Sequence, residues 1–89
     1  MPHLNLQIIG KVQGVFYRDT TKRKAHEFGV HGFVRNQPDG SVYAEVEGTQ
    51  EALNAIVAWC HMGPVQAVVA GVVVSESDIV GFEGFQIRR

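Results

Sequence analysis

One stretch of the chain combines the residue types that can hold an anion. The segment GKVQGVFYR (10–18) places Gly10 and Gly14 ahead of Arg18, which opens a basic run of helical character. The first amides of a helix have no partners inside the helix and carry the positive end of its dipole. A glycine-containing turn before them lets successive amides converge on an anion, and an arginine can grip phosphate through two parallel hydrogen bonds.

The segment therefore predicts an anion-binding loop that leads into Arg18. The backbone amides concerned are those of Gln13, Gly14, Val15, Phe16 and Tyr17. It is not a nucleotide motif, because the chain lacks both the Gly-Lys-Ser/Thr ending of a Walker loop and a G-x-G-x-x-G. An ordinary strand-to-helix connection followed by a surface arginine has the same spacing, so the spacing alone leaves both interpretations open.

Asn36 is a second candidate, at the end of a strand-like segment and just before the turn sequence QPDG. Its amide offers a donor and an acceptor, and it can orient a water molecule beside an anion held by Arg18. Asparagine is also common in turns because it tolerates unusual dihedral angles. Taken alone, Asn36 fits either role.

The elements that would position these residues follow from hydrophobic spacing. Residues 4–9 alternate as a half-buried strand does, and residues 18–28 carry apolar positions at helical spacing up to Gly29. Residues 30–36 and 41–47 flank QPDG as a hairpin. A second helix is capped by Thr49 and ended by Gly63-Pro64, and strands follow at 65–74 and through Phe85 and Ile87.

The predicted order is strand, helix, strand, strand, helix, strand, with a short strand at the end. This order predicts an α+β ferredoxin-like sandwich (βαββαβ), in which an antiparallel sheet of four to five strands carries both helices on one face. The length of 89 residues predicts a single domain over residues 1–89. The architecture alone says little about function, because many functions share it.

Composition excludes several classes of protein. Hydrophobic residues make up 45% and charged residues 19%, with a formal net charge of −1, so we expect no nucleic-acid partner and no membrane partner. The lone Cys60 lies on the apolar stripe of the second helix, and we predict that it is a core residue. The four histidines are scattered, which predicts no metal site. The N-terminus lacks a signal peptide, which predicts a cytoplasmic protein.

The sequence resembles a known family. GKVQGVFYR resembles the first signature of the acylphosphatases, and GFVRNQPDGSVYAEVEG resembles their second signature. The likeness continues through GPVQAVVAGVVV and the closing FQIRR, so it covers nearly the whole chain. Phe33 stands where a tryptophan is common, and Val65 stands where a second proline often follows Gly-Pro. Neither departure touches the proposed chemistry.

The resemblance implies metal-independent hydrolysis of the carboxyl-phosphate bond of an acyl phosphate, with no cofactor. The arginine of the family maps onto Arg18, which would bind the phosphoryl group together with the loop amides of residues 13–17. The asparagine of the family maps onto Asn36, which would orient the attacking water. We expect a small-molecule acyl phosphate substrate and a monomer.

Two other functions share this architecture. RNA-recognition domains have the same strand and helix order, and HGFVRN echoes the Gly-Phe-Val core of their RNP1 motif. The echo falls in the second strand, however, and the first strand has no aromatic residue to stack a second base. A non-catalytic anion-binding module is the other alternative, since larger carbamoyl-transferring hydrogenase maturation proteins resemble the family over one domain.

Overall fold

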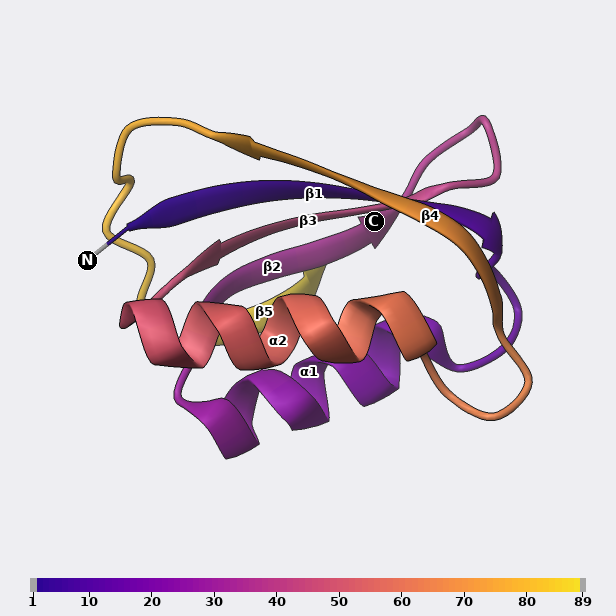
Figure 1. Cartoon of the computed structure of the whole chain (residues 1–89), viewed down its shortest axis with the longest axis horizontal. Helices are drawn as coiled ribbons and strands as arrows, with labels where there is room; N and C mark the ends of the chain where they lie inside the picture. Colours follow the sequence, from indigo (N-terminus) through magenta and orange to yellow (C-terminus); the bar gives the residue numbers. More distant parts are fainter. Residues whose placement is uncertain (1, 89) are drawn as a thin grey trace.

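The computed structural model describes residues 2–88, which form a sheet covered on one face by two helices (Figure 1). The elements follow one another in the predicted order. They are β1 (His3–Lys11), α1 (Tyr17–Phe28), β2 (His31–Asn36), β3 (Val42–Glu47), α2 (Gln50–Met62), β4 (Val68–Glu76) and β5 (Phe85–Arg88). This is the predicted α+β ferredoxin-like fold, and both helices lie on the same side of the sheet.

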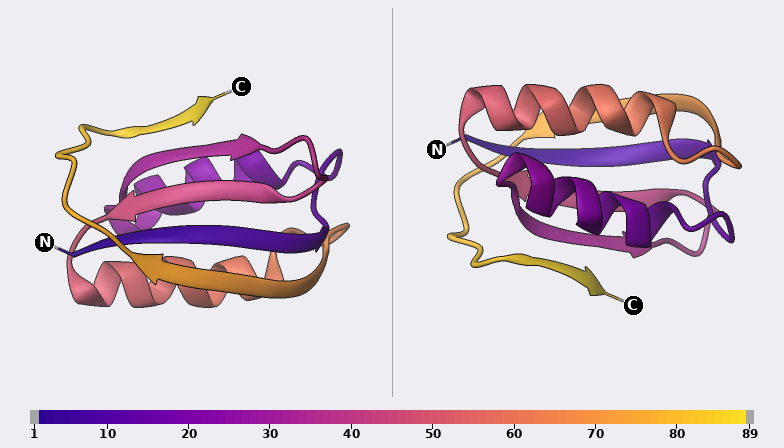
Figure 2. Two further views of the ribbon diagram at one scale, coloured as in Figure 1. Left: turned by 90° about the horizontal axis from the view of Figure 1, so that it is seen from above. Right: turned by 90° about the horizontal axis from the view of Figure 1, so that it is seen from below.

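The sheet is mixed, which corrects the prediction of an antiparallel sheet. Its strands lie in the order β4-β1-β3-β2-β5; the first four pair with antiparallel neighbours, whereas β5 is parallel to β2. The reason is geometric. The chain leaves β4 at the end of the sheet where β2 begins, and residues 77–84 then cross to the opposite edge (Figure 2). A strand that starts there and pairs with β2 must run in the same direction.

The core lies between the sheet and the helices, where the spacing predicts it. Tyr17, Thr21 and Ala25 bury one face of α1, and Gly29 ends this helix with a left-handed backbone, φ 76°. The apolar spacing of α2 predicts a stripe of Leu53, Ile56, Val57 and Cys60. Of these, Val57 is only partly buried and the others are fully buried, and Trp59 joins them in the core. Six side chains of β1, β2 and β3 are fully buried in this core; they are Leu6, Ile8, Val34, Val42, Ala44 and Val46.

The strands β4 and β1 differ from their predicted bounds by more than one residue. β4 begins at Val68 and not at residue 65, because the peptide N–H of Ala67 donates to the carbonyl of Pro64 (2.9 Å) and closes a turn after α2. β1 continues past residue 9 because a register shift at Ile9/Gly10 lets the strand bend and go on pairing with β4. Gly10 has φ 134°, and a Cβ there would clash with the carbonyl oxygen of Val68. The bend directs the chain into the loop before α1.

Candidate active site

The loop between β1 and α1 has the backbone geometry of an anion nest. Gly14 and Phe16 both have left-handed dihedrals, with φ values of 72° and 62°, and Val15 lies between them with a negative φ. Such alternation turns successive peptide N–H groups toward one side of the chain. Phe16 is the N-cap of α1, and it makes no side-chain hydrogen bond to the first helical amides. The amides at this helix start are therefore left to a ligand or to water.

The carbonyl of Phe16 is fixed by the first turn of the helix. It accepts hydrogen bonds from the peptide N–H of Thr20 (3.1 Å) and from the Thr20 hydroxyl (2.8 Å). One turn further in, the Thr21 hydroxyl donates to the carbonyl of Tyr17 (2.7 Å). The loop thus enters α1 with a defined orientation, although an aromatic residue occupies a left-handed position.

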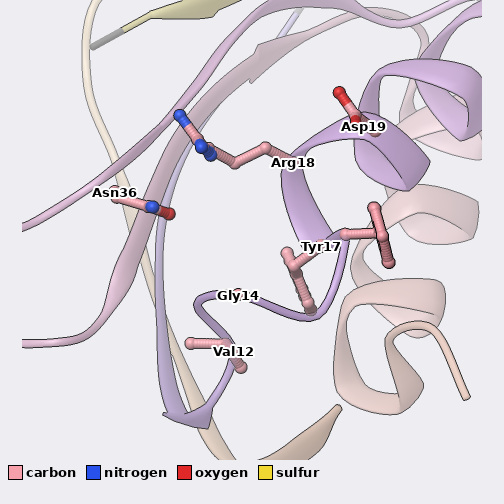
Figure 3. Close-up of a pocket in the computed structure, with 7 residues that line it drawn as sticks. Val12, Gly14, Tyr17, Arg18, Asp19 and Asn36 are labelled. Carbon is pink, nitrogen blue, oxygen red and sulfur yellow. The ribbon is translucent and has the colours of Figure 1, made fainter. Parts of the chain in front are cut away.

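A pocket of about 280 Å³ gathers most of the candidate residues. Its lining comes from Val12, Gly14, Phe16, Tyr17, Arg18, Asp19 and Asn36. In Figure 3 the side chain of Arg18 extends from the start of α1 toward the strand that carries Asn36. Two segments that are far apart in the sequence, the loop with its helix and the end of β2, therefore form one cavity.

Two of the predicted loop residues do not line this pocket. Val15 is buried in the core, only 4% exposed. The side chain of Gln13 turns to the hairpin, where its Nε2 donates to the carbonyls of Gln37 (2.8 Å) and Ser41 (2.9 Å).

Asn36 is held at the last pair of the hairpin, opposite Val42. Its Oδ1 atom is buried and has no hydrogen-bond partner among the described residues. The turn that follows is well fixed, since the peptide N–H and the hydroxyl of Ser41 both donate to Asp39 Oδ1 (2.9 and 2.6 Å). These two hydrogen bonds also hold the pKa of the Asp39 carboxyl below its ordinary value, and the bond from the Ser41 hydroxyl has the larger effect.

Sequence reasoning missed two residues that line the pocket, Val12 and Asp19. Asp19 could have been found from the sequence, because it follows Arg18 directly in the first turn of the predicted helix. The role of the Gln13 side chain has no such signal, because both of its partners are backbone carbonyls at least 24 residues away.

Two titratable groups of the helices, the Cys60 thiol and the Tyr17 hydroxyl, lie in the core. Burial raises the pKa of the Cys60 thiol to about 12, as expected for a core residue and not for a nucleophile. Burial also raises the pKa of the Tyr17 hydroxyl, which donates to the carbonyl of Cys60 (2.8 Å). Within residues 2–88, no three His, Cys, Asp or Glu side chains gather as metal ligands would. No helix in this range has the length and apolarity needed to cross a bilayer.

Comparison with known proteins decides the family. The acylphosphatase family model matches residues 4–87 of the chain. The chain belongs to the acylphosphatase family. It is 51% identical to the acylphosphatase of Thiobacillus denitrificans, over 99% of this chain and 98% of that protein. It is 46% identical to the acylphosphatase of Thermococcus kodakarensis, over 93% and 91% of the two chains. The family and these names imply acylphosphatase activity.

Solved structures agree on the fold. The crystal structure of acylphosphatase from Bacillus subtilis superposes with a TM-score of 0.97 at 30% identity, covering 100% of both chains. The crystal structure of HypF from T. kodakarensis matches with a TM-score of 0.85 at 30% identity, but this similarity covers only 12% of that protein. The family fold thus occurs both in small chains of this length and as one part of a larger protein.

Proposed function

We propose that this chain hydrolyses the carboxyl-phosphate bond of acyl phosphates without a metal ion, releasing a carboxylate and inorganic phosphate. The observation that carries the proposal is the shared pocket. One cavity is lined by the loop before α1, by Arg18 and by Asn36. The loop contains two residues with left-handed backbone dihedrals, and Asn36 has a buried Oδ1 atom without a hydrogen-bond partner among the described residues. Membership of the acylphosphatase family supports the substrate class.

In this proposal the loop and Arg18 bind the phosphoryl group. The peptide N–H groups of residues 13–17 and the guanidinium of Arg18 would donate to the phosphoryl oxygens. Such donors are held in place before the reaction, and they stabilise the charge that develops on the transferring group. A fixed arginine suits phosphate because its planar fork can donate two parallel hydrogen bonds.

Asn36 would orient the attacking water. Its side-chain amide lines the pocket and can hydrogen-bond a water molecule, which then attacks phosphorus while the bond between phosphorus and the acyl oxygen breaks. The electron pair of that bond leaves with the carboxylate. The water oxygen becomes the fourth oxygen of the phosphate, and the proton that it releases moves to a phosphoryl oxygen. Because a carboxylate is a good leaving group, positioning and charge stabilisation can supply the catalysis without a covalent nucleophile.

The proposed roles are tested with benzoyl phosphate, whose hydrolysis is followed by ultraviolet absorbance in the presence of EDTA. Arg18→Ala should lower kcat/KM by about 10³- to 10⁵-fold, as loss of a phosphoryl-stabilising arginine does elsewhere. Asn36→Ala should lower it by about 10²- to 10³-fold. Circular dichroism establishes that each variant is folded.

Matched controls come from the same chain. Arg23 on α1 and Asn54 on α2 are exposed and lie outside the pocket, so Arg23→Ala and Asn54→Ala should retain the wild-type rate. Wild-type turnover in folded Arg18→Ala or Asn36→Ala would overturn the assigned roles. A folded wild-type protein that binds phosphate but hydrolyses neither benzoyl nor acetyl phosphate would overturn the enzymatic proposal.

The RNA-binding alternative gains no support from the sheet. Phe33, the aromatic residue of HGFVRN, is only 5% exposed, and its ring is covered by the guanidinium of Arg88 at 4.1 Å from the ring centroid. Tyr43 and Phe82 pack against the same ring. Stacking of a base needs a free ring face, which Phe33 does not offer.

A further inference from the structure

The side chain of Gln13 connects the phosphate-binding loop to the hairpin that carries Asn36. Its Nε2 atom lies 2.8 Å from the carbonyl oxygen of Gln37 and 2.9 Å from that of Ser41. We infer that Gln13 is a positioning residue for hydrolysis: it sets the place of Asn36 relative to the bound phosphoryl group through the turn at residues 37–41. This inference rests on the proposed function of Arg18 and Asn36.

The two acceptors lie at the two ends of the turn. Both carbonyls already accept a backbone hydrogen bond: Ser41 accepts from the N–H of Gln37 (2.9 Å), and Gln37 accepts from the N–H of Gly40 (3.1 Å). A carbonyl oxygen has two lone pairs and an amide nitrogen has two N–H groups, so Gln13 can donate one hydrogen to each remaining lone pair. One half-buried side chain thus holds both strands of the hairpin where they end.

Asn36 depends on this connection because its own side chain is not anchored. It immediately precedes Gln37 and forms the last pair of β2 with β3. Its Oδ1 atom is buried but has no hydrogen-bond partner among the described residues. The position of the amide is therefore set by the backbone of the hairpin end. Pro38, Asp39 and Gly40 are exposed, and the bonds of Ser41 to Asp39 hold the turn together without connecting it to the loop before α1.

Arg18 and the end of the loop nearest to α1 are held independently of the hairpin. Arg18 and the helix start are held by α1, through the bonds of Thr20 to Phe16 and of Tyr17 to Cys60. Loss of the Gln13 side chain should therefore move Asn36 relative to the phosphate site but leave the phosphate site itself formed. A shift of about 1 Å in a positioning group can cost about 10²-fold in rate. We expect a fall in kcat with little change in phosphate affinity.

The experiment compares Gln13→Met, which keeps the length of the side chain but has no donor, with Gln13→Glu, whose carboxylate would face two carbonyl oxygens. Kinetics with benzoyl phosphate give kcat, and competitive inhibition by inorganic phosphate gives the affinity of the phosphate site. Gln50→Met is the matched control, because Gln50 also donates from its Nε2, to Asn54 (2.9 Å), but on the exposed surface of α2.

We expect kcat to fall about 10- to 100-fold in Gln13→Met and further in Gln13→Glu. The phosphate inhibition constant of Gln13→Met should stay within about threefold of the wild-type value. Gln50→Met should have wild-type kinetics. A folded Gln13→Met with the wild-type kcat would overturn the inference, and so would a loss of phosphate affinity in step with kcat. Either outcome leaves the proposed function standing as long as the wild type is active and Asn36→Ala is not.

A second measurement needs no variant. In the wild-type protein, the side-chain amide protons of Gln13 should exchange slowly with solvent, because both are hydrogen-bonded in a half-buried position. Those of the exposed Gln50 should exchange fast. Equally fast exchange of the two side-chain amides in a nuclear magnetic resonance spectrum would overturn the inference even if the Gln13 variants failed to fold.

Discussion

Phe16 and Asn36 each occupy a state that stability alone does not favour. An aromatic residue with a left-handed backbone costs roughly 1–2 kcal/mol relative to its ordinary conformations, and Phe16 has φ 62° and a side chain that is 71% exposed. A buried polar atom without a partner costs about 1–3 kcal/mol, and Asn36 Oδ1 is such an atom. Both residues line the same pocket. Strain and unmet hydrogen bonding are thus gathered at the proposed site.

His3 and Glu47 form a charged pair at the other end of the sheet. Burial lowers the pKa of His3, but hydrogen bonds to Glu47 and Asn5 and the charges of Glu45 and Glu47 outweigh it, so the pKa lies above the ordinary 6.5. Burial alone would raise the pKa of Glu47, but His3 and three peptide N–H groups, those of residues 80–82, lower it to about 2. The pair is fully charged, and contributes most, between about pH 4.5 and 6.5.

The stability of the fold should depend on the charge of His3. Because the pKa of His3 is raised in the folded state, its contribution is complete below pH 6.5 and is lost as pH rises through the folded pKa. Urea unfolding of the wild type and His3→Gln should therefore show a larger difference in the free energy of unfolding at pH 5.5 than at pH 9. An equal difference at both values would show that protonated His3 contributes nothing to folding.

At the scale of elements, Tyr17 joins the start of α1 to the end of α2. Its hydroxyl donates to the carbonyl of Cys60 at 2.8 Å, and its ring packs on Trp59 with centroids 5.4 Å apart. The residue that would normally donate to Cys60, four positions further on, is Pro64, which has no N–H. The tyrosine therefore supplies the hydrogen bond that the helix itself cannot make.

Tyr17→Phe should lower the free energy of unfolding by about 1–3 kcal/mol, because it leaves the buried carbonyl of Cys60 without a donor. Urea unfolding measures the change, and Tyr43→Phe is the control. Tyr43 loses the same atom, but its hydroxyl bonds the half-buried Glu45, and the cost there should stay below about 1 kcal/mol. Equal costs at the two positions would contradict the role assigned to Tyr17.

Local rules predicted the helices and the hairpin well because their signals lie within a few residues. Gly29 ends α1, and the Thr49 hydroxyl caps α2 by accepting from the N–H of Ala52 (3.1 Å), as expected. The mixed sheet was not predicted, because the pairing of β5 with β2 depends on where residues 77–84 cross the sheet. The arrangement of the site lies between these cases. Arg18 and Asn36 stand out in the sequence, but their common pocket is a product of the fold.

At the scale of the whole molecule, the described sheet has one edge that exposes apolar side chains. Strand β4 lies at this edge, and Val68, Val73 and Val74 are each more than 40% exposed. An exposed edge of this kind can pair with another chain, and a lysine on the edge opposes such pairing. The opposite edge, β5, ends in an arginine and is only four residues long.

Val73→Lys should slow aggregation in mildly denaturing conditions and change the free energy of unfolding by less than about 0.5 kcal/mol, since Val73 is 54% exposed. Light scattering during a temperature ramp measures the aggregation. Ile79→Lys adds the same charge at a position that is 56% exposed but outside β4, and it should aggregate as the wild type does. If both variants aggregate equally slowly, net charge and not the strand edge is responsible.

The parallel pairing of β5 determines what the first and last strands lie beside within residues 2–88. Arg88 pairs with Arg35, the neighbour of Asn36, whereas His3 at the start of β1 pairs with Glu47 at the far end of the sheet. A fluorescent protein or an affinity tag joined after β5 would emerge next to the pocket and compete with substrate for the space around it. The same fusion placed ahead of β1 leaves the pocket accessible, so an assay or a sensor built on this domain should be attached there.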